Sequence, residues 1–374
     1  MTSRERVLTA FSHREPDRVP AWCGSSPEFW SKAKSALGLD DEGLRQRLGD
    51  DFRRVFARYA GPDLGLSPGA TWKSPFGIER TGIGYGQPLT HPLIDAKTVR
   101  DILDYQWPDP AWMDVSYVKA EAERWRGEYA ILGGDWSAFW HDVIDLVGLE
   151  TLYYMMYDNP EAALLLFEKT TDFYCDVSER IFQASGPSID IFFIGNDFGS
   201  QTGPLLGVDL FERFAMPSLR RLIDLGHRFG KKVMMHCCGG FRPLFPSLIR
   251  AGLDGVHALQ PFCAGMEPAG LKRDFGGRIL LNGAIDSHHV LIDGTPEFVR
   301  EQTRTVLDVM SPGGGYVAGA SHDYILEETP LENVLAMFDT VREYTRPGTP
   351  WPKNAAAYRD RKNATGYRGR VRRN

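Results

Sequence analysis

Three features are scarce or absent in this 374-residue sequence, and each excludes a class of protein. No apolar stretch approaches the roughly 20 residues that a membrane-spanning helix needs, so we expect no membrane contact. The first 20 residues are rich in Arg and Glu and have no apolar core, unlike a secretory signal. Five cysteines are too few for a disulfide framework in a chain of this length. We therefore expect a cytoplasmic protein whose thiols are free or bind metal.

Positive charge is concentrated at the C-terminal end. Residues 349–374 carry eight Lys and Arg residues against one Asp, whereas the whole chain has a net charge of −6. This tail lacks apolar periodicity, so we expect it to be disordered, as a solvated terminus or as a contact for an acidic partner. The acidic remainder argues against nucleic acid as the main ligand.

Short apolar runs alternate with amphipathic helices after residue 128. Six runs predict strands, at 129–133, 189–195, 232–235, 255–259, 278–281 and 315–319. Helical periodicity predicts helices at 160–184, 209–229, 243–251, 266–275, 296–309 and 330–345. Strands that alternate with helices form parallel βαβ units. Six units and an early strand or two favour an α/β fold, a single (β/α)8 TIM barrel with an N-terminal extension.

The first 128 residues are less regular. A Ser/Thr start and apolar residues at helical spacing predict a helix over 2–11, and residues 19–23 are a candidate short strand. Residues 61–92 are rich in Gly and Pro, which predicts a long excursion or β-hairpins over the body. We assign 1–348 to one domain, with 1–128 as its N-terminal segment and excursion and 129–348 as its regular βα units.

Polar residues follow nearly every predicted strand. These residues are Gly134–Asp135, Asn196–Asp197, His236–Cys238, Gln260, Asn282 with Asp286, and Ser321–His322. In a βα barrel these positions share one face, where active sites are built. Taken singly, Asp197 and Asp286 fit helix N-caps, but six such positions in register are hard to explain as caps alone.

The pair His236 and Cys238 is the most informative of these positions. Imidazole and thiolate are common zinc ligands, and a catalytic zinc site needs only three protein ligands. Strand alternation turns Cys238 inward with His236 and leaves Cys237 facing away. A lone His or Cys is more often a buried core residue, but the pair at a strand end favours metal ligation. The third ligand is open between His322 and Cys263.

Aromatic side chains are expected to form the wall of a small-molecule pocket. Trp136 and Trp140 belong to one aromatic cluster, His141 follows it directly, and Tyr85 lies in the N-terminal excursion. We expect polar residues at the strand exits to line the same pocket, namely Asn196, Gln260 and Asn282.

Several segments resemble the uroporphyrinogen decarboxylase-like superfamily, in order over most of residues 1–345. They are Ser3–Pro20, Asn196–Pro204, His236–Gly239, Gln260–Met266 and Thr329–Asn333. The resemblance implies a (β/α)8 barrel and one of two chemistries. Heme-pathway decarboxylases resemble one another in sharing an Arg-Gln-Ala-Gly-Arg segment that binds substrate carboxylates. This chain has Ala21–Ser25 there, without arginine, which disfavours that activity.

The other branch is similar to zinc methyltransferases that exchange methyl groups with a corrinoid protein. Their ligands are a His-x-Cys pair, which His236 and Cys238 match, and a distant Cys, whose place falls near Ser321. His322, the next residue, sits where the decarboxylases carry a functional His. The resemblance thus implies zinc, a corrinoid supplied by a partner protein, and a small O-, N- or S-methyl substrate. Relatives are often dimers, which makes a homodimer one option, although the sequence itself does not indicate the oligomeric state.

The leading interpretation is therefore a methyltransferase, with catalytic roles for Asp197, Asp286, His322 and His141. The first alternative is a metal-free decarboxylase of a small acid or tetrapyrrole-like substrate, in which His322 or Asp197 protonates the carbanion. Arg18 or Arg242 would hold its carboxylate. The second alternative is a non-catalytic ligand-binding barrel, because the missing distant Cys is typical of an enzyme that has lost its activity.

Overall fold

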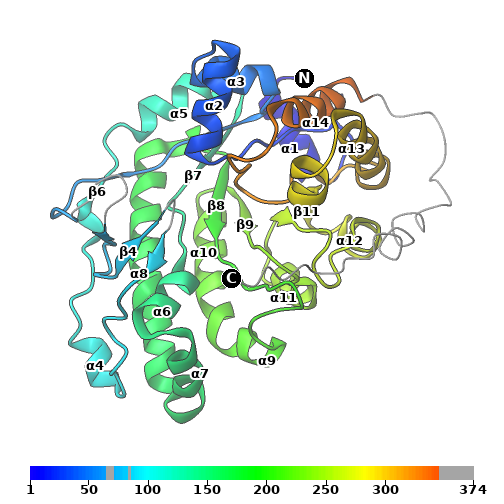
Figure 1. Cartoon of the computed structure of the whole chain (residues 1–374). Coiled ribbons are helices and arrows are strands. Elements are labelled where there is room, and N and C mark those ends of the chain that lie inside the picture. Colours follow the sequence, from blue (N-terminus) through cyan, green and yellow to red (C-terminus); the bar gives the residue numbers. More distant parts are fainter. Residues whose placement is uncertain (65–70, 83–85, 345–374) are drawn as a thin grey trace, which may run out of the picture.

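The computed structural model describes residues 1–64, 71–82 and 86–344, so the predicted tail and Tyr85 lie outside the described residues. Seven parallel strands form a curled sheet in the order β1-β7-β8-β9-β10-β11-β12 (Figure 1). Their bounds are β1 (Phe52–Arg54), β7 (Ala130–Gly133), β8 (Ile191–Gly195), β9 (Lys232–His236), β10 (Gly255–Leu259), β11 (Leu280–Ile285) and β12 (Tyr316–Ala320). Strands β7, β8, β10, β11 and β12 are buried throughout, which explains their continuous apolar sequences.

The segment Pro20–Trp22 closes the sheet between β12 and β1. The Trp22 N–H donates to the Ala318 carbonyl at 2.8 Å, and the Ala318 N–H donates to the Pro20 carbonyl at 2.8 Å. On the other side, the Asp51 N–H donates to the Ala21 carbonyl at 3.0 Å. This short segment, where the sequence predicts a strand, takes the place of the eighth strand. The predicted TIM-barrel fold is confirmed.

Helices surround the strands, as Figure 1 shows. After β7 they are α6 (Phe139–Val147), α7 (Leu149–Asp158), α8 (Pro160–Ser185), α9 (Val208–Leu210), α10 (Met216–Arg228), α11 (Phe245–Arg250), α12 (Pro268–Phe275), α13 (Pro296–Met310) and α14 (Leu331–Glu343). The helix predicted over 209–229 is interrupted by a π-helical turn at Phe211–Ala215. Within the described ranges, no helix has both the length and the apolar character of a membrane span.

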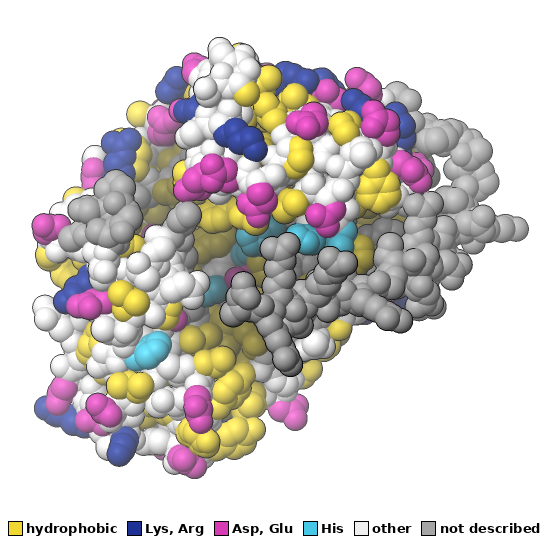
Figure 2. All heavy atoms as spheres, in the orientation of Figure 1, with side chains coloured by type: hydrophobic (Ala, Val, Ile, Leu, Met, Phe, Trp, Pro, Cys, Tyr) yellow, Lys and Arg dark blue, Asp and Glu magenta, His cyan; other side chains and the backbone are white. Residues whose placement is uncertain are grey.

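Helix α1 (Ser3–Phe11) covers the N-terminal end of the barrel. It begins after Thr2, whose hydroxyl accepts the Glu5 N–H, and its Val7 and Phe11 pack with inward-facing strand residues in one apolar cluster. Arg6 also forms an ion pair with buried Asp51 at 2.7 Å. The C-terminal end of the strands is therefore the end at which a site can open to solvent. In the same orientation, Figure 2 shows histidine side chains gathered around a hollow in the visible face.

The N-terminal region adds four helices and two small antiparallel sheets. The helices are α2 (Pro27–Leu37), α3 (Asp41–Leu48), α4 (Val99–Leu103) and α5 (Val118–Arg126). One sheet pairs β2 (Arg58–Tyr59) with β6 (Met113–Asp114), and the other joins β3 (Trp72–Lys73), β4 (Glu79–Thr81) and β5 (Gln87–Pro88). The second sheet provides the β-hairpins that the sequence predicts.

Buried Arg80 attaches this second sheet to the barrel. Its guanidinium pairs with Asp142 at 3.1 Å and with Asp145 at 2.8 Å, and both aspartates belong to α6. Because α6 also carries His141 on its first turn, the excursion helps to fix the helix that faces the candidate site.

Candidate metal centre

Three potential metal ligands meet at the C-terminal ends of two adjacent strands. Asp197 follows β8, His236 ends β9, and Cys238 lies two residues further on. The register pairs Gly195 with His236, which brings the two strand ends together. Ligand atoms of Asp197, His236 and Cys238 all lie within 4.8 Å of one another. We call these three residues the metal group.

Two distances within the metal group are close to those between the ligands of a zinc ion. Cys238 Sγ lies 3.3 Å from His236 Nε2, and the same nitrogen lies 3.4 Å from Asp197 Oδ1. Tetrahedral zinc with ordinary bond lengths separates such ligand atoms by about 3.4–3.6 Å. A thiolate, an imidazole and a carboxylate are also ligand types that zinc accepts, and three protein ligands leave the fourth position for substrate.

Two glycines bring the loops of the metal group into backbone contact. A Cβ on Gly199 would lie 2.4 Å from the Cys238 carbonyl oxygen, and one on Gly239 would lie 2.4 Å from the Gly199 carbonyl carbon. Gly239 also has a φ of 85°, which favours glycine. This approach lets the Cys238 N–H donate to Asp197 Oδ1 at 2.7 Å. The glycine after each ligand segment is therefore what allows the two loops to meet.

The protonation states of the three ligands differ. Burial lowers the pKa of His236, so its imidazole is neutral at pH 7. Burial favours the protonated form of Asp197, but the nearby His236 and His141 outweigh it and lower the pKa of this carboxyl. Burial raises the pKa of the Cys238 thiol well above its usual value, and Asp197 raises it further. Metal binding must therefore displace the Cys238 proton.

Predicted residues that surround the metal group include His141, Trp136 and Gln260. The Asp197 N–H donates to His141 Nε2 at 3.1 Å, and Asp197 Oδ2 lies 3.5 Å from the same nitrogen. The Trp136 ring lies beside the His236 ring, with centroids 5.6 Å apart. The Gln260 side-chain oxygen accepts the N–H of Gly239 at 2.8 Å, which supports the Cys238 loop.

Trp140 and Asn196, which the sequence predicts in the pocket, are buried supports of the Asp197 loop. The Trp140 indole N–H donates to the Asp197 carbonyl at 2.9 Å. Asn196 Oδ1 accepts the Trp140 backbone N–H at 2.9 Å. Both residues are fully buried. Their contacts hold the loop after β8 against α6.

His322 and Cys263, the two candidates for the third ligand, lie outside the metal group. His322 Nδ1 accepts the Tyr324 N–H at 3.0 Å, and Cys263 Sγ lies 3.4 Å from Gln260 Oε1. Of the residues that the structure describes, only Asp197 joins His236 and Cys238 in a three-ligand group. The geometry thus gives Asp197 the position that the sequence leaves open.

Asp286 and Asn282 also lie apart from the metal group. Asp286 accepts the N–H groups of His288 and His289 and so caps the π-helical turn Ser287–Ile292. Asn282 was expected after a strand, but β11 continues to Ile285, so Asn282 lies within the strand and is buried.

Three residues that the sequence did not single out extend the centre: His257, Asp323 and Arg54. His257 is the register partner of His236, and their Nδ1 atoms lie 3.0 Å apart. Asp323 Oδ1 lies 4.0 Å from His257 Nε2 and accepts a hydrogen bond from Arg54 Nη2 at 3.0 Å. The available signal was the strand register, because His257 occupies the inward position opposite His236.

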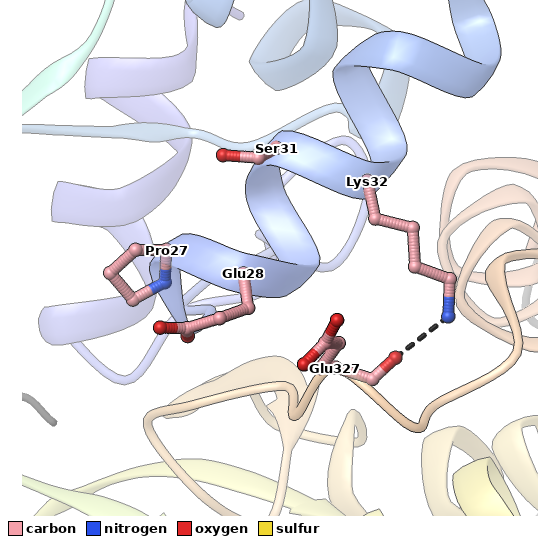
Figure 3. A pocket seen from close by; sticks show the side chains of 5 residues that line it. All are labelled: Pro27, Glu28, Ser31, Lys32 and Glu327. Atoms are coloured by element: carbon pink, nitrogen blue, oxygen red, sulfur yellow. Dashed lines mark hydrogen bonds between the residues drawn. The ribbon is translucent and has the colours of Figure 1, made fainter. Parts of the chain in front are cut away.

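A second, separate hollow lies at the start of α2 (Figure 3). Its lining residues are Pro27, Glu28, Ser31, Lys32 and Glu327. Lys32 Nζ donates to the Glu327 carbonyl at 2.7 Å, as the dashed line in Figure 3 shows. No member of the metal group lines this hollow, so it is not part of the candidate centre.

Fold and site together define a TIM barrel with a metal-competent centre at the C-terminal ends of its strands. Residues 82–344 match the family model described as uroporphyrinogen decarboxylase (URO-D). The chain therefore belongs to the URO-D family, which is a family of enzymes, and the resemblance in the sequence is confirmed.

Similar proteins include two kinds of enzyme. The methylcobamide:CoM methyltransferase MtbA of Methanosarcina acetivorans is 25% identical over 144 residues, which cover 37% of this chain and 38% of that protein. The uroporphyrinogen decarboxylase of Azoarcus sp. is 24% identical over 203 residues, which cover 51% of each chain. The match thus spans about half or less of these relatives. A solved methyltransferase structure from Methanosarcina mazei has a TM-score of 0.64 at 18% identity and covers 92% of this chain and 99% of its own, which shows the shared fold.

Proposed function

We propose that this protein is a zinc-dependent methyltransferase that moves a methyl group between a small O-, N- or S-methyl substrate and the corrinoid of a separate partner protein. The metal group of Asp197, His236 and Cys238 is the observation that carries this proposal. Two methylcobamide:CoM methyltransferases from Methanosarcina species among the relatives support it.

The residues around the metal group have distinct roles in this function. Zinc, when bound by Asp197, His236 and Cys238, would supply a Lewis acid for the heteroatom that carries or receives the methyl group. His141 accepts the Asp197 N–H and so fixes the backbone of that ligand. Trp136 lies beside His236 and supplies an apolar wall, which keeps water from this side of the centre.

Room for Trp136 depends on a glycine. A Cβ on Gly195, the last residue of β8, would lie 2.0 Å from the Trp136 ring. The indole can therefore lie across the end of β8 only because residue 195 has no side chain. We assign Trp136 to the wall of the substrate site for this reason.

Decarboxylation is the second candidate function, because uroporphyrinogen decarboxylases are also among the relatives. The two arginines expected to hold a carboxylate are engaged elsewhere: Arg18 pairs with Asp51 at 2.9 Å, and Arg242 pairs with Asp274. Arg54 is a cationic side chain next to the centre; it pairs with Asp323 at 3.0 Å, and 21% of its side chain is exposed. A carboxylate substrate would compete with Asp323 for this guanidinium. The other alternative, a non-catalytic ligand-binding barrel, is disfavoured because the chain belongs to a family of enzymes.

Metal analysis and two activity assays test the proposal. The full chain is purified, its zinc content is measured, and methyl transfer is followed by cobalamin absorbance with free cob(I)alamin and a panel of O-, N- and S-methyl donors. We expect turnover that His236→Ala abolishes. His227→Ala is a matched control, because His227 pairs with Asp254 on the outside of the barrel. A protein that binds no zinc and transfers no methyl group contradicts the proposal, and zinc-independent CO2 release supports decarboxylation.

A further inference from the structure

A second buried histidine lies directly behind the candidate zinc ligand. His257 is fully buried in β10, and its Nδ1 lies 3.0 Å from His236 Nδ1. Its other ring nitrogen, Nε2, is also buried and has no hydrogen-bond partner among the described residues. A buried polar atom without a partner is costly, so this arrangement calls for a functional explanation.

The close approach of the two Nδ1 atoms determines where the protons lie. At 3.0 Å, one nitrogen must donate a proton and the other must accept it. His236 presents Nε2 to Cys238 and Asp197, so a metal-binding His236 carries its proton on Nδ1. His257 must then accept at Nδ1 and carry its own proton on Nε2. The nearby carboxylate oxygen Asp323 Oδ1 lies 4.0 Å from this Nε2.

We propose that His257 is a positioning residue for the metal centre. Its Nδ1 accepts a hydrogen bond from the Nδ1–H of His236 and holds His236 with Nε2 toward the metal. The Asp323 carboxylate, 4.0 Å from His257 Nε2, favours the His257 tautomer that carries its proton on that nitrogen. This role rests on the proposed function, because it requires His236 to bind zinc. Histidine ligands in other zinc sites commonly donate their second N–H to a carboxylate, a carbonyl or a water. Here a second histidine takes that place.

Packing holds the His257 ring in the required orientation. The Trp22 and Phe193 rings lie against it, with centroids 4.6 and 5.6 Å away. Asp323 is held in turn by Arg54, whose guanidinium lies over the Trp22 ring at 4.5 Å. The packed rings therefore restrict rotation of the His257 imidazole, which lies between His236 and Asp323.

Gly24 makes room for Asp323. A Cβ on Gly24 would lie 2.0 Å from the Asp323 carbonyl oxygen and 2.7 Å from its Oδ1. Gly24 belongs to the segment Ala21–Ser25, where the resembling decarboxylases carry arginine. In this chain the segment lacks that cation and admits a carboxylate to the centre. Asp323 and Gly24 thus form part of the same arrangement.

Zinc affinity of the full chain tests the role of His257. The metal is removed, and zinc binding is measured by competition with a chromophoric chelator for wild type, His257→Phe and His257→Gln. We expect about 10–100-fold weaker zinc binding in His257→Phe, because phenylalanine fills the space but cannot accept a hydrogen bond from His236. His257→Gln should recover part of this loss through its amide oxygen. The spectrum of the cobalt-substituted protein should change in His257→Phe, and His227→Phe should match wild type in both measurements.

The outcomes separate this role from the proposed function. If wild type binds no zinc, the proposed function fails. If wild type binds zinc and His257→Phe binds it equally well with an unchanged cobalt spectrum, the role of His257 is refuted. Should His257→Phe fail to fold by circular dichroism, Asp323→Asn replaces it. We expect Asp323→Asn to weaken zinc binding several-fold, and wild-type affinity in that variant would refute the role.

Discussion

Zinc binding at this centre is expected to release about one proton per ion near neutral pH. His236 has a pKa lowered by burial, so it is already neutral and contributes no proton. Asp197 remains buried but ionised, because the neighbouring histidines lower its pKa. Cys238 has a pKa raised well above its usual value by burial, so its thiol is protonated until the metal binds. One proton therefore leaves, and it comes from Cys238.

The size of the effect follows from linkage. The logarithm of the zinc affinity rises with pH in proportion to the number of protons released, so one proton gives about a tenfold increase per pH unit, or about 1.4 kcal/mol. The increase should extend from about pH 7, where His236 is neutral, to above pH 8.5, the usual pKa of a free thiol. Below that range, His236 begins to be protonated and the dependence becomes steeper.

Calorimetry can measure the proton directly. Zinc is titrated into the metal-free full chain in two buffers with different ionisation enthalpies, and the difference between the heats gives the number of protons released. Cys238→Ser should release close to none. Cys237→Ser is the matched control, because this neighbouring buried thiol accepts the Phe198 N–H and lies outside the metal group. Release of no proton, or of two, by wild type would refute the reasoning.

Three further predictions concern the ligand set and the frame that holds it. Asp197→Asn should weaken zinc binding, measured by chelator competition, by more than the roughly 10–100-fold expected when a residue that only supports a ligand is lost. His322→Ala should leave the zinc affinity unchanged. A larger loss in His322→Ala than in Asp197→Asn would contradict the ligand set. Gly199→Ala should lower the free energy of unfolding by about 1–3 kcal/mol, and the zinc affinity with it, because its Cβ meets the Cys238 carbonyl. Arg80→Met should cost about 3–5 kcal/mol in urea unfolding, because two buried carboxylates lose their cationic partner, and a cost under about 1 kcal/mol would disprove this.

The regular half of the fold was predictable because its strands are buried on both faces and therefore form continuous apolar runs. The early strand β1 escaped prediction because Phe52–Arg54 is short and carries two arginines, one of which, Arg54, belongs to the centre. The strand predicted at 278–281 ended too early, because a polar residue follows it. Asn282 interrupts the apolar run, although the strand continues through it to Ile285.

Two of the three residues of the metal group could be predicted from strand alternation, which places His236 and Cys238 on the same side. The position of Asp197 as a ligand could not be predicted. It depends on the backbone contact between Gly199 and Gly239, which lie in different loops, after β8 and after β9. His257 was hidden within an apolar strand, where a single histidine resembles a core residue. Only the pairing of β9 with β10 shows that it lies against His236.

The closing segment Pro20–Trp22 has a consequence for synthesis on the ribosome. Its bridge joins Ala21 to Ala318, so two segments about 300 residues apart must meet before the cylinder is complete. Until β12 emerges, a nascent chain exposes the unpaired edge of β11, and unpaired edges promote aggregation. Products of premature termination before residue 316 should therefore be insoluble, whereas chains that end after α14 can complete the ring of strands. Closure of the barrel is therefore a late step that requires β12 to be synthesised first.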